Sequence, residues 1–171
     1  KFDPDGSTAG GFPEYAWQGN LPNDTSGNAA DFTFSCWVKT PWAGNDGKFH
    51  TVFDSRASTG ANGGYIYKTG TSEGDNQFFF AMPGFEPLRA QMVQGQWTAN
   101  TPHHLVAVAD RLGDTQATLS LYLDGALLKT QTFAGTAKPH TTFRLGSGYY
   151  GSDSLDAVLA ELTIFNYALS P

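Results

Sequence analysis

The chain has 171 residues, a formal net charge of −6, four histidines and one cysteine. This length suits one β-sandwich domain, so we expect residues 1–171 to form a single domain. The acidic balance argues against binding to nucleic acid or to an anionic membrane surface. Only 15% of the residues are charged, while 20 are glycine and 9 are proline. This composition indicates many turns and an uncharged polar surface, which is typical of secreted proteins.

Short strands are predicted along most of the chain, because apolar residues alternate with polar ones or form short runs. Clusters of glycine, proline, asparagine and aspartate separate these runs. No segment longer than ten residues has a helical period. The expected strands are a short one near 14–17, followed by 32–40, 49–55, 64–68, 77–82, 88–93, 103–110, 117–124, 127–133, 142–146 and 157–165.

The clearest alternation lies in the run LSLYLDGALL. Leu119, Leu121 and Leu123 share one phase, with polar residues and one tyrosine in the other. One face of this strand is therefore expected to be buried and the other to face outward. The pair Asp124-Gly125 then predicts a tight hairpin turn, because glycine adopts positive φ freely and aspartate does so more readily than most residues.

Four segments resemble, in the same order along the chain, the laminin-G-like, concanavalin-A-like domains of secreted bacterial proteins. The segments are FTFSCWVKT (32–40), GQWTANTPHHLVAVAD (95–110), LYLDGALL (121–128) and LAELTIFNYALSP (159–171). The resemblance implies an all-β fold, with two antiparallel sheets packed as a jelly-roll β-sandwich. The abrupt start at KFDPDG and the end just after ALSP predict a domain excised from a larger secreted protein. Because this architecture carries lectins, lyases, glycosidases and adhesion domains, function has to be argued from the site.

No catalytic motif is recognisable. Glycosidases that resemble this chain carry carboxylates at alternate positions of one strand, but the run Glu73–Asp75 leads into phenylalanines and begins in a glycine-rich loop. His103 and His104 are neighbours on a predicted strand, so one is expected to be packed and the other exposed. Cys36 shares its phase with core phenylalanines and is expected to be a buried thiol. We therefore expect a domain that is not an enzyme.

Sugars are bound by aromatic rings together with polar side chains, so we separate the aromatic residues that the fold itself needs from the rest. Trp37 is assigned to the fold because the resembling family usually has a tryptophan there. The other aromatic residues assigned to the fold are Phe32, Phe34, Phe53, Trp97, Phe133 and Phe143. The aromatic residues that remain are borne by loops and, together with Arg56, form the predicted glycan site: Trp17, Trp42, Phe85, Tyr149 and Tyr150.

The resemblance also implies a structural calcium ion. Calcium prefers carboxylate and carbonyl oxygens, and the predicted ligands are Asp3 and Asp5 in the first loop and Asp156 before the last strand. The family often has Asp-Glu in that last strand, whereas this chain has Ala160-Glu161. Exposed turn carboxylates without an ion are therefore the alternative.

The leading hypothesis is a secreted, monomeric, lectin-like carbohydrate-binding module that holds a polysaccharide or glycan with its loop aromatics. Two alternatives stay open: an extracellular adhesion or protein-interaction domain, and a polysaccharide lyase or glycosidase with an unrecognised site. A cleft lined by aromatics would favour glycan, and a flat apolar patch would favour protein. If the loop aromatics are not the site, the concave sheet face around Trp37 and Tyr122 is the next candidate.

Overall fold

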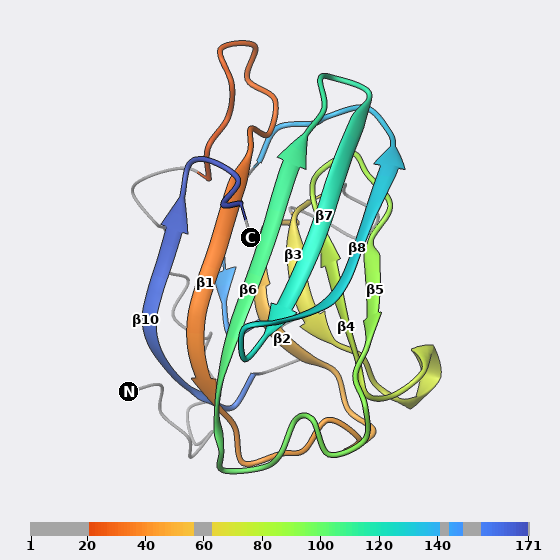
Figure 1. Cartoon of the computed structure of the whole chain (residues 1–171), viewed down its shortest axis with the longest axis vertical. Helices are drawn as coiled ribbons and strands as arrows, with labels where there is room; N and C mark the ends of the chain where they lie inside the picture. The colour runs from red at the N-terminus through yellow and green to blue at the C-terminus, as the bar shows by residue number, and fades with distance from the viewer. Residues whose placement is uncertain (1–20, 57–62, 141–143, 149–154, 171) are drawn as a thin grey trace.

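The computed structural model describes residues 21–56, 63–140, 144–148 and 155–170. This part of the chain forms ten strands and one short 3-10 turn, η1 (Thr71–Glu73) (Figure 1). The strands are β1 (Phe32–Lys39), β2 (His50–Asp54), β3 (Tyr65–Lys68), β4 (Gln77–Ala81), β5 (Leu88–Gln91), β6 (Pro102–Arg111), β7 (Gln116–Leu123), β8 (Ala126–Ala134), β9 (Arg144–Leu145) and β10 (Val158–Phe165).

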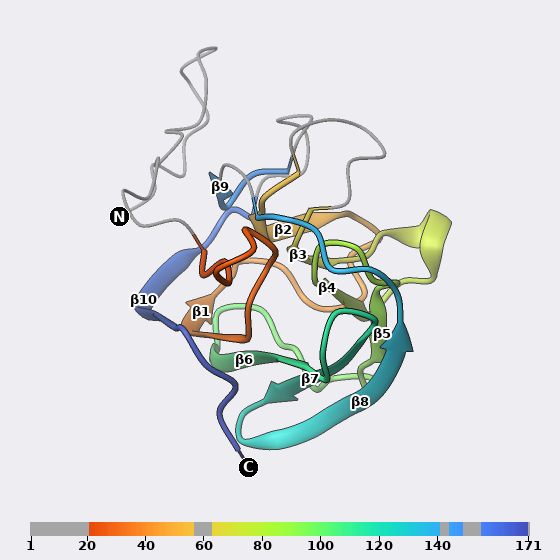
Figure 2. The same ribbon diagram turned by 90° about the horizontal axis from the view of Figure 1, so that it is seen from above.

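Two antiparallel sheets pack face to face, as the view from above shows (Figure 2). The first sheet has the strand order β10-β1-β6-β7-β8, and the second has the order β5-β4-β3-β2-β9. Strand β5 of the second sheet contacts β8 of the first, so the two layers meet along one edge of the sandwich. The predicted fold class, an antiparallel two-sheet β-sandwich of the jelly-roll kind, is confirmed.

The core lies between the sheets and is built from the inward phase of each strand. In β1, Phe34, Cys36 and Val38 are buried. Trp37 and Lys39, which belong to the opposite phase, are exposed. The three leucines of β7 are buried in the same way. Burying one such aliphatic or aromatic side chain contributes about 1.5–3 kcal/mol, so the alternation decides which face of each sheet becomes the core.

The predicted hairpin is present between β7 and β8. Leu123 pairs with Ala126, which leaves Asp124 and Gly125 as a two-residue turn. Their φ angles are 52° and 78°, the left-handed values that a type I′ hairpin turn needs at both positions. Here the sequence pattern and the backbone agree residue by residue.

All the strands predicted between 32 and 165 have a counterpart whose bounds differ by two residues or less. The strand expected near 14–17 lies outside the described residues. One assignment was wrong: Trp37 is not a core residue but is 40% exposed. Its phase in β1 is opposite to that of Phe34, so its ring lies on the outer face of the first sheet. No helix among the described residues has the length and apolar character that a membrane span requires.

Candidate functional site

The outer face of the second sheet carries aromatic side chains that start from β3. This strand reads Tyr65-Ile66-Tyr67-Lys68, and alternation sends Ile66 and Lys68 inward, where both are fully buried. Tyr65 and Tyr67 are half-buried on the opposite side. The sandwich therefore holds two neighbouring tyrosines at its surface on a rigid strand.

The sheet register extends this pair into a row. Tyr67 lies opposite Phe79 of β4, and Phe79 lies opposite Arg89 of β5. The ring centroids are 5.0 Å apart for Tyr65 and Tyr67 and 5.2 Å apart for Tyr67 and Phe79. The guanidinium carbon of Arg89 lies 4.5 Å from the Phe79 centroid, and that of Arg56 lies 4.5 Å from Tyr65 and 5.8 Å from Tyr67. We call these five residues the Tyr–Arg face.

Arg56 is fixed at one end of the Tyr–Arg face by an ion pair. Its Nη2 atom donates to Oδ2 of Asp54 at 2.6 Å, and its Nε atom donates to both carboxylate oxygens at 3.0 Å. Burial alone would lower the pKa of Arg56, but the Asp54 carboxylate outweighs it and raises that pKa. The backbone of Gly63 packs closely against that of Arg56, and only glycine fits there, because a Cβ atom would lie 2.6 Å from the Arg56 backbone.

The two tyrosines keep their protons over the physiological range. Burial is the largest cause that raises the pKa of both phenols, and the negative charge of Glu73 raises each pKa further. The Arg56 charge acts in the opposite direction but does not reverse the shift. Protonated phenols both donate and accept hydrogen bonds, so Tyr65 and Tyr67 can read the hydroxyl groups of a bound ligand.

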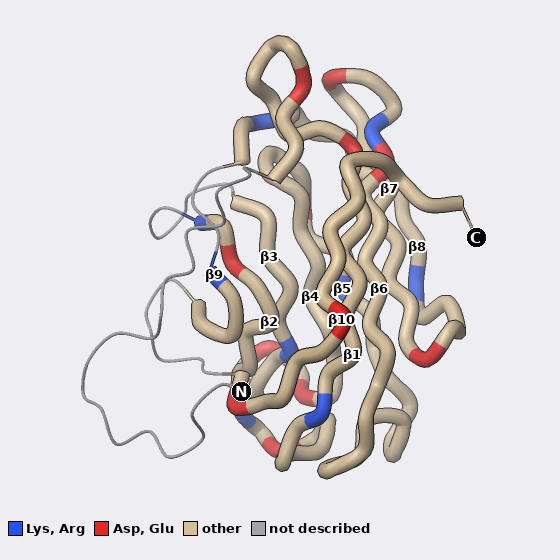
Figure 3. Tube along the Cα trace, turned by 90° about the vertical axis from the view of Figure 1, so that its left-hand side faces the viewer, with Lys and Arg blue, Asp and Glu red and all other residues tan. Residues whose placement is uncertain are grey.

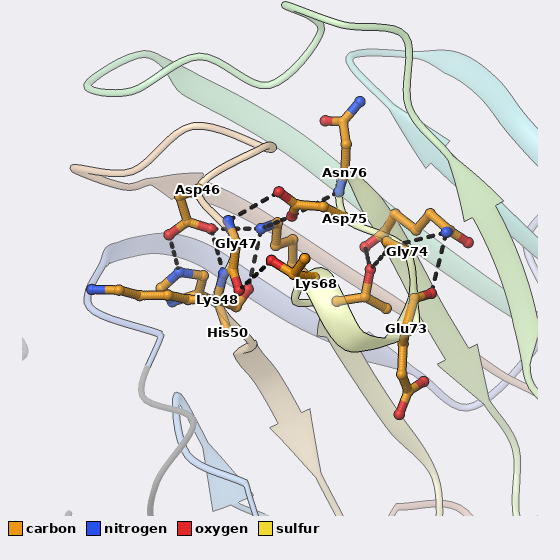
Figure 4. Close-up of polar contacts among 12 residues, drawn as sticks. Asp46, Gly47, Lys48, His50, Lys68, Glu73, Gly74, Asp75 and Asn76 are labelled. Carbon is orange, nitrogen blue, oxygen red and sulfur yellow. Dashed lines mark hydrogen bonds and ion pairs between the residues drawn. The ribbon is translucent and has the colours of Figure 1, made fainter.

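A partly buried ion-pair network lies at the end of β3, where the buried Lys68 contacts two half-buried aspartates (Figure 4). Lys68 Nζ donates to Asp46 Oδ1 at 2.5 Å, to Asp75 Oδ1 at 2.6 Å and to the carbonyl oxygen of Lys48 at 3.1 Å. Asp46 also bonds His50 Nε2 at 2.7 Å. Burial alone raises the pKa of Asp46, but the bonds from Lys68 and His50 outweigh it and hold the pKa below its ordinary value.

The network ties the loop between β1 and β2 to the loop between β3 and β4. Phe49, from the first of these loops, has its ring centroid 6.0 Å from that of Tyr67 and so borders the Tyr–Arg face. Gly70 leaves room for it, since a Cβ atom there would meet the Phe49 ring at 2.9 Å. The exposed side chain of Glu73 points away from the Lys68 network (Figure 4). Lys68 therefore helps to hold the margin of the Tyr–Arg face.

Two predicted site residues lie in the core instead. Trp42 is 8% exposed. Its ring stacks on His50 at 3.9 Å and on Trp97 at 5.4 Å, and its Nε1 atom donates to the carbonyl oxygen of Leu155 at 2.7 Å. Phe85 is also 8% exposed. The expectation that both present free rings was wrong, because a large ring in a loop gains more by folding back onto the core.

Of the other residues of the predicted glycan site, three lie outside the described residues and one lies on the Tyr–Arg face. Trp17, Tyr149 and Tyr150 lie outside the described residues. Arg56 belongs to the Tyr–Arg face, as its loop position allowed. Arg89 is likewise a strand-end polar residue of the kind that the sequence suggests for hydrogen bonds to a ligand. The prediction missed the three aromatic members of this face, Tyr65, Tyr67 and Phe79, which the sequence shows as the phase of YIYK opposite to its isoleucine and as one phase of the strand that follows.

The histidine pair behaves as alternation predicts. His103 is buried; its Nε2 atom accepts from the Thr98 backbone N–H at 3.2 Å, so Nδ1 carries the proton that is donated to Asp124 Oδ2 at 2.8 Å. His104 lies on the other side of β6 and stacks on Trp37 with ring centroids 5.0 Å apart. One imidazole is packed and the other faces outward, as expected, and they cannot share a ligand.

The described residues offer little for nucleophilic or redox chemistry. Burial raises the pKa of the Cys36 thiol to about 12, so this thiol stays protonated. Asp75, the partner of Glu73 in the acidic run, is engaged by Lys68. The imidazole of His140 is buried, and neither of its ring nitrogens has a hydrogen-bond partner in the described part of the chain. Burial lowers its pKa to about 4.

The calcium site stays a prediction. Asp156 is exposed and has a φ of 45°, whereas Asp3 and Asp5 lie outside the described residues. In the part of the chain that the structure describes, no group of three or more histidine, cysteine, aspartate or glutamate side chains could hold a metal ion. Acidic and basic residues are spread over this part without gathering by sign (Figure 3).

The outer face of the first sheet presents a second exposed surface. Trp37 lies opposite Ala160 of β10 and His104 of β6, and His104 Nε2 bonds Ser35 Oγ at 2.9 Å. Val158 at one edge is 56% exposed and Leu127 at the other is 51% exposed. The large exposed ring of this surface is that of Trp37, which stacks on His104.

Comparison with known proteins places the fold. A family model described as the concanavalin A-like lectin/glucanases superfamily matches residues 17–171. No curated protein matches the chain. A solved structure titled as a "putative carbohydrate binding protein" from Bacteroides ovatus is similar with a TM-score of 0.64 and 12% identity, over 88% of this chain and 41% of that one.

Binding domains of clostridial toxins are similar as well. The receptor binding domain of botulinum neurotoxin mosaic serotype C/D has a TM-score of 0.59 and 14% identity, over 82% of this chain and 34% of its own. A structure of botulinum neurotoxin type C has a TM-score of 0.51 and 15% identity, over 82% of this chain and 33% of its own. The chain thus spans well under half of the length of these proteins, and at such identities the likeness concerns the fold.

Proposed function

Since this chain belongs to the concanavalin A-like lectin/glucanase superfamily, we propose that it is a carbohydrate-binding domain that holds a glycan on the Tyr–Arg face. The observation that carries the proposal is the row itself, in which three aromatic rings lie between two guanidinium groups on a rigid sheet. Aromatic rings contact the C–H surfaces of sugars, while phenol hydroxyls and guanidinium N–H groups bind their oxygens. This face supplies both kinds of group at once.

The similar structures support a binding role of this kind. One is titled as a "putative carbohydrate binding protein", and for another, botulinum neurotoxin type C, cell entry depends on interaction with two ganglioside molecules. These are properties of those proteins. They make a glycan the first ligand to try on this chain.

We also propose that the domain is not an enzyme and acts outside the cell. Glycoside hydrolysis needs two carboxyl groups facing the same bond, and the acidic run at Glu73–Asp75 has one exposed member and one member bound to Lys68. A low proportion of charged residues, 15%, supports an extracellular surface. Incubation with a panel of polysaccharides should release neither reducing ends nor unsaturated products.

The proposal is tested by the affinity of variants for a polysaccharide that the wild-type domain binds. An aromatic contact contributes about 0.5–1.5 kcal/mol, so Tyr67→Ala and Tyr65→Ala should each weaken binding about two- to tenfold in calorimetric titrations. Trp37→Ala is the matched control, because it removes an exposed ring from the opposite face. Unchanged binding in both tyrosine variants, with a loss in Trp37→Ala, would move the site to the first sheet.

A second candidate function rests on that first sheet. Trp37, Val158 and Leu127 lie on the outer face of this sheet, with Val158 and Leu127 at its opposite edges, and are exposed by 40%, 56% and 51%. Exposed apolar side chains spread over one sheet face favour contact with another protein. An adhesion domain would use this area and would leave the Tyr–Arg face unused. Glycan binding that is lost in Tyr67→Ala and kept in Trp37→Ala argues for the carbohydrate-binding role over this one.

A further inference from the structure

Arg89 differs from the other arginines in the described residues. Arg56 is held by Asp54 through Nε and Nη2. Arg111 binds two aspartates and a carbonyl oxygen. Arg144 donates from Nη1 to the carbonyl oxygen of Arg56. Arg89 forms no hydrogen bond or ion pair with any described residue. Its guanidinium group makes a cation–π contact with the ring of Phe79.

The guanidinium group of Arg89 is nevertheless held in place. Phe79 is 1% exposed, and the guanidinium carbon lies 4.5 Å from its centroid, so the cation covers the ring. The two residues occupy paired positions of β4 and of β5, the edge strand of the second antiparallel sheet. A guanidinium group has five N–H donors in a planar fork that matches two oxygens of a carboxylate or sulfate group. At Arg89 this fork is exposed, lies over the Phe79 ring and has no hydrogen-bond or ion-pair partner among the described residues.

We propose that the glycan bound on the Tyr–Arg face carries an anionic group, a carboxylate or a sulfate ester, and that Arg89 binds this group through paired N–H donors. The inference rests on the proposed function and names its substrate class. The sugar ring next to the anionic group lies toward Tyr67 and Tyr65, which are the following members of the row.

The charges around the face place the anionic group at the Arg89 end. The Arg56 cation at the other end is already neutralised by Asp54. The charge of Glu73 acts on the two tyrosines and raises their pKa values, so it opposes a second anion beside them. The whole chain carries a net charge of −6. A preference for anionic glycans therefore cannot come from the net charge and must come from this position.

The experiment compares glycans that differ in charge and share a backbone. The wild-type domain is titrated with polygalacturonate and its methyl ester, and with dextran sulfate and dextran. Arg89→Gln removes the charge, and Arg89→Lys keeps the charge but loses the planar fork. Lys129→Gln on β8 is the control, because it removes one exposed positive charge from the other sheet.

We expect one of the anionic polymers to bind about tenfold or more tightly than its neutral counterpart. Arg89→Gln should abolish this difference, Arg89→Lys should retain part of it, and Lys129→Gln should retain nearly all of it. The polymer that binds tells a carboxylate from a sulfate. Added salt should weaken binding only modestly if the contact is a paired hydrogen bond and not a diffuse attraction.

Two other outcomes separate this inference from the proposed function. If the neutral polymers bind as tightly as the charged ones and Arg89→Gln changes nothing, while Tyr67→Ala weakens binding, the anionic preference is wrong and the carbohydrate-binding role stands. If no polymer of a broad panel binds, the carbohydrate-binding role fails and the inference fails with it. If all four proteins bind the anionic polymers equally, the attraction is non-specific and the role of Arg89 is refuted.

Discussion

Arg89 of β5 lies directly opposite Phe79 of β4 in the sheet register, and its guanidinium carbon is 4.5 Å from the centre of the Phe79 ring. A cation over a ring is stabilised by the negative charge of the ring face, by about 0.5–1 kcal/mol at an exposed site. The pairing also keeps a buried ring beneath a charged group. Tyr67 and Tyr65 continue the row from Phe79 on the same sheet, so the Arg89 guanidinium group and the aromatic rings belong to one surface.

Trp42 and Trp37 should respond in opposite ways to removal of the ring. Trp42→Ala deletes a ring that is 8% exposed and stacked on His50 and Trp97, and should lower the free energy of unfolding by about 3–5 kcal/mol. Trp37→Ala deletes a ring that is 40% exposed and should cost less than about 1 kcal/mol. Urea denaturation followed by fluorescence measures both. Equal losses in the two variants would contradict these placements.

Lys68→Met should destabilise the domain strongly. The change keeps the apolar stem of a fully buried side chain but leaves Asp46 and Asp75 without the ammonium group that joins them. The two carboxylates are 19% and 25% exposed, so loss of the cation costs about 1–3 kcal/mol, less than in a fully buried pair. Thermal and urea unfolding give the loss.

The matched control for this change removes the carboxylate charges as well. A triple variant with Lys68→Met, Asp46→Asn and Asp75→Asn should recover part of the stability, because no buried charge is then left unpaired. If the midpoint of urea unfolding is the same for Lys68→Met and the wild-type domain, the network contributes nothing to the stability of the fold and other contacts hold the loops.

The buried imidazole of His140 predicts a loss of stability in mild acid. The pKa of His140 is lowered by burial from 6.5 to about 4 in the folded domain. Between these two pH values the unfolded chain binds the proton and the folded chain does not. The stabilising contribution is therefore complete above about pH 6.5 and is lost as the pH falls toward 4, by about 3 kcal/mol in total.

This pH dependence is isolated by comparing variants. His140→Leu should unfold with a flatter dependence on pH between 6.5 and 4 than the wild-type domain. His104→Gln, which changes an imidazole on the outer face, should keep the wild-type slope. Identical slopes in all three proteins would mean that His140 is accessible to protons in the folded state.

The predicted calcium ion is tested by stability in the presence and absence of the ion. At a calcium concentration about 100 times the dissociation constant, binding to the folded state alone adds about 2.7 kcal/mol. Melting curves in EDTA and in calcium should then differ, and Asp156→Asn should reduce the difference. Superimposable curves would remove calcium from the account of this domain.

The strands could be predicted because their pattern is local. Alternation in segments such as the β7 run fixes which side chains are buried without any knowledge of distant residues. The Asp124-Gly125 turn was predictable for the same reason, since the two residues supply the φ angles that the turn needs. The error at Trp37 arose because the tryptophan that is usual in the resembling family was given more weight than the phase of the strand.

The site was harder to predict because it depends on the register between strands. The ring of Trp42 is buried by contacts with His50 and Trp97 and by a bond to Leu155, which is 113 residues away along the chain. Nothing in the sequence of the loop shows this. The row from Tyr65 to Arg89 exists because β3, β4 and β5 align in one register, and the apolar run 77–82 hides which of its phenylalanines faces outward.

The most direct test of the account is a chemical-shift titration of the 15N-labelled domain with the glycan that it binds. We predict that the largest shifts lie on the Tyr–Arg face, at the amides of Tyr65, Tyr67, Phe79 and Arg89, while the amides around Trp37 on the first sheet stay in place. Shifts that cluster around Trp37 and leave the Tyr–Arg face unchanged would contradict the account.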